Sequence, residues 1–461
     1  MEIGYRTSYH VTRWAILRLL GCMYFVAFLG AYYQNPGLMG SKGLQPADVV
    51  FDSLKSQQHP ASNWEGFQQY PSIFWWIDHN DANMEGVNLA GMTISALVVI
   101  FEQDSMLLQF LLWILYFSIV TTGQLATSFY SYGWESQLLE TGFLAIFLCD
   151  PPWVGLSSMS STSDVERSRK APSMIVLWLF RWLCFRISIG AGLIKIRGDS
   201  CWTQKTCLFY HFETQPIPSP LSFFFHFLPR YPFLYHAVDL DLFVQVYTSW
   251  MVLCPTFAAD KEGNNFLSRM SIYLVRIGGF VQTGFMVNIL LSGNFASLNH
   301  LTIVPSLASL DDACWPRLLQ RRLRVLEGIE KGRTDRPTTV GSSKELSKTQ
   351  SDPSRFHWVL DQGVYVILLV VIAYLSMPVV TNLLQLGGKH QQMNASFGNF
   401  RLVNTYGAFG SVGKARYEPI VSVAYAGSAG QGEFEWIELD FPCKPGKLSR
   451  RPCFCAPYHY K

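Results

Sequence analysis

The sequence predicts a mainly α-helical, polytopic transmembrane bundle of about nine spans, followed by a small β-rich C-terminal segment. Its composition is the first observation behind this prediction. Of the 461 residues, 49% are hydrophobic, 15% aromatic and only 15% charged, whereas an ordinary soluble domain has about 25% charged residues. The second observation is that the apolar residues form runs long enough to cross roughly 30 Å of hydrocarbon. The net charge of +3 is too small to indicate a nucleic-acid-binding protein.

Seven apolar runs are predicted to span the membrane: 14–33, 86–101, 106–123, 173–194, 240–257, 272–291 and 358–384. The first is interpreted as an uncleaved signal anchor, because it starts too far inside the chain and is too aromatic for a cleaved signal peptide. Two further runs, 137–148 and 298–310, are short for a span and also fit re-entrant or interfacial helices. If both cross the membrane, the chain has nine spans.

The charges of the loops predict the orientation, because cytoplasmic loops of membrane proteins carry an excess of Lys and Arg. Loops 151–172 and 311–357 are basic and are predicted to be cytoplasmic, as is the N-terminus. Loop 34–85 has two Lys against six acidic residues and is predicted to lie on the far side, together with loop 195–239. Nine crossings satisfy these assignments and place the C-terminus on the far side.

The predicted membrane domain covers residues 1–384, and residues 385–461 are predicted to form a second, β-rich domain. Short alternating stretches at 420–425 and 434–441 lie between Gly, Ser and Pro residues, which is typical of strands. Asn394 begins an Asn-Ala-Ser sequon, so a far-side location of the tail predicts that it is glycosylated.

Charged side chains within or beside predicted spans are costly and therefore indicate a site. The candidates are Glu135, Glu140, Arg181, Arg186 and Lys195. Arg181 and Lys195 fall about 40° apart on one helix face, and an ion pair between this helix and Glu140 is expected. Two interpretations remain open: an ion pair that fixes helix packing, or a polar cavity for a lipid or small molecule.

Half of the ten cysteines lie in segments predicted to face a compartment that permits disulfides. These are Cys201, Cys207, Cys443, Cys453 and Cys455. Plain disulfide formation is the preferred interpretation, and the three tail cysteines leave one over. A zinc site made of Cys201, Cys207 and His211 is a weaker alternative because the spacing is loose, and a redox pair lacks the Cys-x-x-Cys spacing.

Loop 195–239 is rich in aromatic residues and is broken by five prolines. Such a segment fits the membrane interface, and it also fits an exposed apolar surface for a protein client. The client-binding candidates are Trp202, Tyr210, His211, Glu213 and Gln215. If Trp202 anchors a client, its loss should lower client binding without lowering the protein's abundance. The sequence holds no Ser-His-Asp order, Gly-rich phosphate loop or His-Glu-x-x-His motif, and no catalytic residue, metal or cofactor is predicted.

Long and rare strings are scattered over the chain from residue 133 onward. They are G-W-E-S-Q-L-L-E-T-G-F at 133–143, G-A-G-L-I-K-I-R-G-D at 190–199, H-F-E-T-Q-P at 211–216, L-N-H-L-T-I-V-P-S-L at 298–307, N-T-Y-G-A-F-G at 404–410, and C-K-P-G followed by S-R-R-P-C at 443–453. In these strings the sequence resembles the lipase maturation factor family. The family's chains run on beyond P-Y-H-Y, whereas this sequence stops at Lys461, so an incomplete tail domain is expected.

The resemblance implies a multi-pass protein of the endoplasmic reticulum membrane that helps secreted dimeric lipases, such as lipoprotein lipase, to fold and assemble in the lumen. It implies no catalytic residues, and its partners would be membrane lipids and lumenal lipases, with no nucleic acid. The two cysteine strings of the tail frame a loop that a Cys443–Cys453 disulfide can close, which leaves Cys455 free.

Two other functions remain as alternatives. The membrane region also resembles that of the vitamin K-dependent carboxylase, which implies a membrane enzyme whose base would be Lys195, His211 or Glu140. A lipid or solute transporter is the second alternative, although two similar halves with broken helices, which would favour it, are not seen in the sequence.

Overall fold

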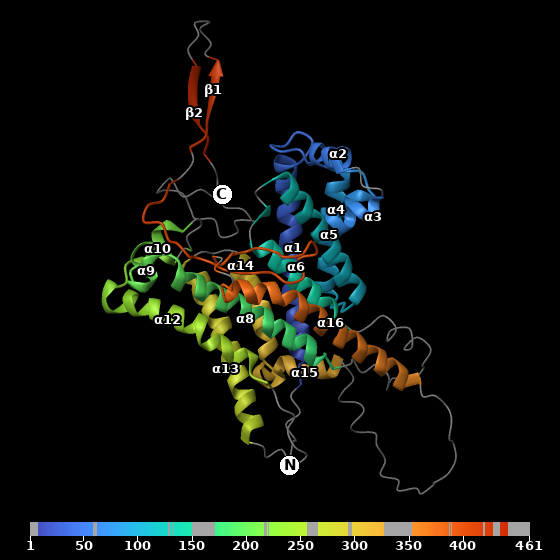
Figure 1. Ribbon diagram of the computed structural model, residues 1–461, viewed down its shortest axis with the longest axis vertical. Coiled ribbons are helices and arrows are strands. Elements are labelled where there is room, and N and C mark those ends of the chain that lie inside the picture. The colour runs from blue at the N-terminus through green and yellow to red at the C-terminus, as the bar shows by residue number, and fades with distance from the viewer. Residues whose placement is uncertain are drawn as a thin grey trace.

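Among the described residues, six helices are long and apolar enough to cross a membrane, and they dominate the computed structural model (Figure 1). They are α1 (His10–Leu38), α4 (Asp81–Ile100), α5 (Met106–Ala126), α8 (Met174–Arg197), α13 (Phe266–Ser292) and the Gln362–Leu383 part of α16 (Pro353–Leu383). The structure describes residues 8–58, 62–127, 130–131, 133–149, 171–215, 219, 221–255, 266–293, 297–326, 353–386, 388, 390–417, 420–426 and 434–440. A mainly helical, multi-pass membrane protein is therefore confirmed.

Shorter elements lie between and beyond these helices. The short α-helices are α2 (Ala47–Gln58), α3 (Asn63–Gln69), α6 (Gly133–Ile146), α9 (Ser200–Thr203), α10 (Leu208–Thr214), α11 (Ser222–His226), α12 (Tyr235–Val246), α14 (Ser297–Ser306) and α15 (Arg317–Leu326). Other helical turns are η1 (Ile73–Trp75), η4 (Arg230–Leu234), η5 (Thr248–Leu253), η6 (Leu307–Ser309) and η7 (Asp312–Cys314). Strands β1 (Ser422–Ala426) and β2 (Phe434–Glu438) form an antiparallel pair in which Ser422 lies opposite Glu438.

The count of nine spans is not confirmed, because three predicted spans form shorter helices. Run 137–148 corresponds to α6, and run 298–310 corresponds to α14 and η6. Run 240–257 is interrupted at Tyr247, where α12 ends and η5 begins, so no single helix covers it. The prolines of loop 195–239 predict that this segment does not form one long helix. The structure has a series of short helices there, from α9 to η4.

The break between α12 and η5 is stabilised by a polar side chain of α13. Gln282 Nε2 donates hydrogen bonds to the carbonyl of Val244 (3.2 Å) and to the Thr248 hydroxyl (3.3 Å). Gln282 Oε1 accepts a further hydrogen bond from the Ser188 hydroxyl (2.6 Å) of α8. Backbone groups freed from a helix at membrane depth need such partners, because hydrocarbon offers none.

Helix α1 packs along α4 and also contacts α6 and α14 inside the bundle. Tyr24 of α1 is completely buried, and its ring meets the ring of Tyr116 edge-on at 5.9 Å between centroids. Gly142 of α6 makes this packing possible, since a Cβ atom at that position would collide with the Tyr24 hydroxyl. The core therefore depends on close helix approach through small residues, as is common in membrane proteins.

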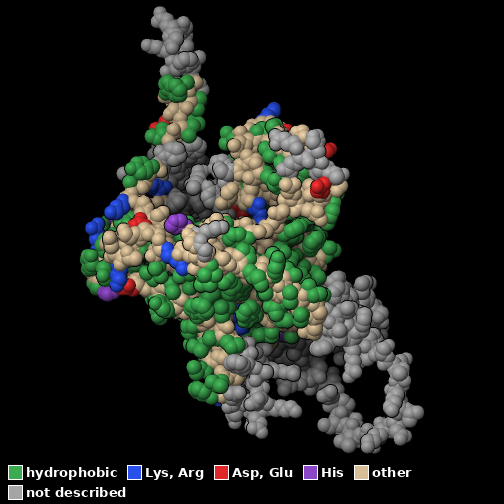
Figure 2. Space-filling view, in the orientation of Figure 1, with side chains coloured by type: hydrophobic (Ala, Val, Ile, Leu, Met, Phe, Trp, Pro, Cys, Tyr) green, Lys and Arg blue, Asp and Glu red, His purple; other side chains and the backbone are tan. Residues whose placement is uncertain are grey.

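Short elements flank the long helices at both ends of the molecule. In Figure 1, α2, α3 and the two strands lie at the upper end of the view, and α15 lies at the lower end, where it contacts α1. The backbone N–H of Val11 donates to Asp312 Oδ1 (2.8 Å), which fixes the start of α1 beside η7. Figure 2 shows hydrophobic side chains covering the middle of the molecule over α8, α13 and α16, with charged side chains gathered around α9 and α10.

Candidate functional site

Helix α8 carries three buried cationic side chains, Arg181, Arg186 and Lys195, and each reaches a different element. Arg181 donates from Nη2 to the Tyr9 hydroxyl (2.9 Å) and from Nε to the carbonyl of Ala308 (3.0 Å). It therefore ties α8 to the residue that precedes α1 and to η6. Such extensive pairing is what buried charges in a membrane protein require.

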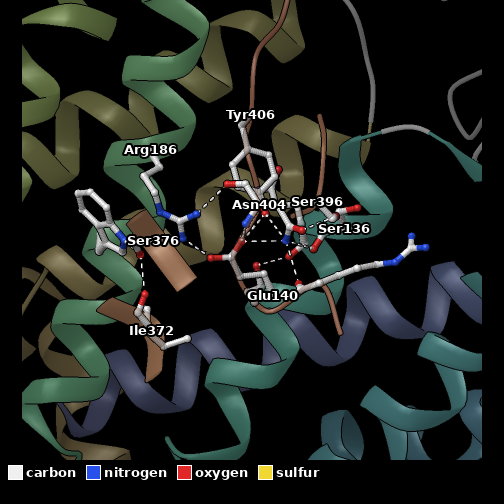
Figure 3. Close-up of polar contacts among 12 residues, drawn as sticks. Ser136, Glu140, Arg186, Ile372, Ser376, Ser396, Asn404 and Tyr406 are labelled. Carbon is white, nitrogen blue, oxygen red and sulfur yellow. Dashed lines mark hydrogen bonds and ion pairs between the residues drawn. The ribbon is translucent and has the colours of Figure 1, made fainter. Parts of the chain in front are cut away.

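Arg186 forms an ion pair with Glu140 of α6, and both side chains are 1% exposed (Figure 3). Residues 390–417, here called the C-terminal strap, complete this cluster through Asn404 and Tyr406. Glu140 Oε2 accepts hydrogen bonds from the Asn404 backbone N–H (3.1 Å), from Asn404 Nδ2 (3.0 Å) and from the Tyr406 hydroxyl (2.7 Å). Arg186 Nη1 donates to the Asn404 carbonyl (2.8 Å).

These contacts leave the Glu140 carboxylate fully engaged. Burial, and then the nearby carboxylate charge, raise the pKa of Tyr406, so its phenol stays protonated and remains a donor. A buried ion pair offsets its desolvation only when further hydrogen bonds use its remaining capacity, and the strap supplies them. The geometry thus favours the interpretation of Glu140 and Arg186 as a pair that fixes packing.

Glu135, the other predicted acidic residue of α6, is also completely buried. Arg401 of the strap lies near enough to interact with it electrostatically. Burial lowers the pKa of Arg401 to about 10, and the Glu135 charge opposes this shift. The strap therefore contacts α6 through the polar side chains of Asn404 and Tyr406, and it also places the cationic Arg401 near Glu135.

The strap approaches α8 closely at Gly190. A Cβ atom there would collide with the backbone carbonyl of Tyr406. We expect Gly190→Val to displace the strap and to increase its cleavage by protease in detergent. Gly284→Val is the matched control, because Gly284 lies in α13 with no neighbouring atom within 4 Å. Equal cleavage of the two variants would contradict this assignment of Gly190.

A disulfide joins Cys201 and Cys207, whose Cα atoms lie 4.9 Å apart, and it closes the turn between α9 and α10. Trp202, within this turn, is 1% exposed and packs in a small buried cluster with Val238 and Val412. The disulfide and the tryptophan thus belong to one hydrophobic unit that joins loop 195–239 to the strap.

Two polar contacts position Trp202. Its Nε1–H donates to the carbonyl of Phe409 in the strap (2.7 Å), and Lys195 Nζ lies 4.6 Å from the centre of its ring. Lys195 also forms an ion pair with Asp241 of α12 (2.5 Å). In this conformation the ring has no free surface for a client, which favours a structural role for Trp202.

The other client-binding candidates differ in exposure. His211 and Gln215 are buried, and Gln215 Nε2 contacts His211 Nδ1 at 3.0 Å. Tyr210 is half-buried, with Lys414 Nζ 5.7 Å from its ring centre. Glu213 is exposed and lies 3.7 Å from His226. The structure therefore places Tyr210 and Glu213, but not His211, Gln215 or Trp202, where a protein partner can reach them.

The burial of His211 predicts a pH dependence of stability. Burial, and then the positive charge of Lys195, lower the pKa of His211 from 6.5 to about 3; Asp241, paired with Lys195, also lies beside this site. Between these pKa values the unfolded state binds more protons than the folded state, so stability falls as the pH drops from 7 toward 4. We expect a loss of about 2 kcal/mol at pH 5. His211→Gln should remove this slope in thermal unfolding series, and an unchanged slope would contradict the prediction.

Other predicted site residues have simpler outcomes. Cys443, Cys453 and Cys455 lie outside the described residues. Asn394 is exposed in the strap, and its Nδ2 donates to the Gly407 carbonyl (3.2 Å). Among the described residues, no group of three or more His, Cys, Asp or Glu side chains is arranged to hold a metal ion.

Sequence reasoning missed Asn404, Tyr406 and Arg401 of the strap, and Asp241 of α12. Asn404 and Tyr406 stand in the rare string at 404–410, but nothing in that string indicates a partner in a distant helix. Asp241 could have been found from the sequence, because an acidic residue at the start of a predicted span needs a partner.

Comparison with known proteins gives a consistent result over nearly the whole chain. The lipase maturation factor transmembrane domain matches residues 11–317, and the lipase maturation factor C-terminal domain matches residues 402–461. Lipase maturation factor 1 of Homo sapiens is 40% identical over 456 residues, which are 98% of this chain and 73% of the relative. The Bos taurus protein of the same name is 38% identical over 471 residues, covering 98% and 74%. No solved structure matches the chain.

Proposed function

The chain belongs to the lipase maturation factor family, and from this premise we propose that it is a folding and maturation factor for secreted dimeric lipases in the endoplasmic reticulum membrane. The single observation that carries the proposal is the 40% identity to lipase maturation factor 1 over 98% of the chain. We further propose that it acts by binding its client and not by catalysis. Two of the three candidate bases support this, because Lys195 and Glu140 are held in ion pairs.

The surface best suited to a client lies beside the disulfide-closed turn. Three phenylalanines of α11 and the residue after it are exposed to solvent. Their exposed fractions are 63% for Phe223, 65% for Phe224 and 67% for Phe227. Glu213 of α10 is exposed on the same short-helix segment, and α10 packs against α11. Exposed aromatic side chains on a braced scaffold are typical of surfaces that bind protein partners.

Paired substitutions test this surface. Phe223→Ser with Phe224→Ser is expected to reduce co-precipitation of lipoprotein lipase and secretion of active lipase, at normal abundance of the factor. Trp436→Ser is the control, because Trp436 is 68% exposed on β2, away from this surface. Loss of binding in the Trp436 variant alone would instead assign the client to the tail.

We also propose a topology of nine crossings, with a cytoplasmic N-terminus and a lumenal C-terminus. Its support is that α2, α3 and the strands lie opposite the α15 end of the bundle (Figure 1). In this topology α6, the broken α12–η5 pair and α14 complete the spans together with the six long helices.

A glycan at Asn394 is the expected consequence of this topology. The sequon is modified only in the lumen, so treatment with an endoglycosidase should increase the electrophoretic mobility of the protein. Asn394→Gln should have the mobility of the treated protein. Cleavage of the tail by protease added to sealed microsomes would overturn the proposed orientation.

A further inference from the structure

A cavity of about 410 Å³ lies between the short helices α10–α12 and the second half of α13. Its walls include Leu234, Val244, Val281 and Phe285, and Phe409 of the strap lies against one side. Cavities that bind small molecules in proteins have volumes of about 300–1,000 Å³ and are lined mainly by apolar side chains. This cavity therefore has the size and lining of a ligand site.

The rim of the cavity is apolar and exposed. Phe233 and Leu240, which line it, are each 61% exposed, and Leu228 is 39% exposed. Helix α13, which forms one wall, is itself long and apolar enough to span a membrane. The opening consequently lies beside lipid-facing surface, where a ligand can enter from the bilayer without crossing water.

The polar groups of the cavity carry no net charge. Lys195 lines it but is paired with Asp241 at 2.5 Å. His211 is neutral at physiological pH because burial and Lys195 lower its pKa to about 3. An anionic headgroup would find no unpaired cation among these three side chains, and burying an unpaired charge is costly.

His211 nevertheless offers a hydrogen bond. Gln215 Nε2 lies 3.0 Å from His211 Nδ1 and also donates to the His211 carbonyl (3.1 Å), so Nδ1 is the acceptor. The proton of the neutral ring is thereby assigned to Nε2. A Cβ atom built on Gly293, another lining residue, would lie 3.5 Å from Nε2, which places this donor at the cavity wall.

We propose that this cavity binds one uncharged acyl lipid, such as an acylglycerol, with its acyl chain along α13 and its hydroxyl or ester oxygen at His211. The proposal concerns a lipid ligand and does not depend on which lipase is the client. An uncharged head matches the paired Lys195 and Asp241, and the apolar rim matches the chain.

The test uses the full chain in detergent, with diacylglycerol, fatty acid and phosphatidylcholine probes that carry a photoreactive acyl chain. We expect diacylglycerol to label peptides of α12 and α13 most strongly. Val281→Phe should fill the cavity and reduce this labelling by at least about tenfold. Val287→Phe is the matched control, because Val287 is 40% exposed on the same helix and does not line the cavity.

A second variant tests the role of charge. Asp241→Asn leaves the Lys195 charge without its partner, so we expect labelling to shift from diacylglycerol toward the anionic fatty acid. Comparable labelling of the Val281 and Val287 variants would overturn the proposal. So would dominant labelling by phosphatidylcholine or fatty acid in the unsubstituted protein.

Discussion

Replacing Glu140 with alanine is expected to destabilise the protein by about 3–5 kcal/mol, because it leaves the Arg186 charge buried without its partner. It also removes the acceptor of the Asn404 and Tyr406 hydrogen bonds, so the strap should detach from α6. The measurement is thermal unfolding of the detergent-solubilised protein, followed by size-exclusion chromatography.

The control and the double variant separate charge from packing. Asp239→Ala breaks the exposed Lys205–Asp239 pair and should barely change the unfolding temperature. Glu140→Leu combined with Arg186→Met replaces the buried pair by apolar side chains and should recover part of the loss. If Glu140→Ala unfolded at the temperature of the Asp239 variant, the ion pair would have no structural role.

Trp202→Ala is expected to cost about 3–5 kcal/mol, as is usual when a buried tryptophan is truncated. The substitution removes the ring from the cluster at the disulfide and leaves the Phe409 carbonyl without its donor. We therefore expect abundance of the factor and secreted lipase activity to fall together.

A graded series strengthens this test. Trp202→Phe keeps an aromatic ring but loses the hydrogen bond to Phe409, so its effect should be smaller. Trp64→Ala, at a position that is 58% exposed, should have little effect on stability. If the Trp202→Ala variant had normal abundance but no longer bound lipase, the result would contradict a structural role and would support Trp202 as a residue that contacts the client.

Much of the membrane architecture could be predicted from the sequence, because long apolar runs have few alternatives to helices in a bilayer. Six of the predicted runs coincide with helices long enough to span. The run at 240–257 could not be resolved in this way, since hydropathy does not show that Gln282 stabilises a break at Tyr247.

The polar cluster was predictable only in part. Charges within spans require partners, which pointed correctly to a contact between Glu140 and α8. The strap's contribution was not predictable, because Asn404 and Tyr406 lie in a segment with no apolar periodicity. Local sequence carries no signal for a contact between residues so far apart along the chain.

The strap also constrains the order in which the protein is made. Arg186 and Asn404 are 218 residues apart, so at a synthesis rate of about 5–20 residues per second the helix waits roughly 10–40 s for its last partner. During that interval Glu140 and Arg186 can meet but lack the groups that complete their hydrogen bonding. The nascent chain therefore carries an unfinished polar interior until the strap has been translated, and we expect membrane-protein quality control to recognise it during that interval.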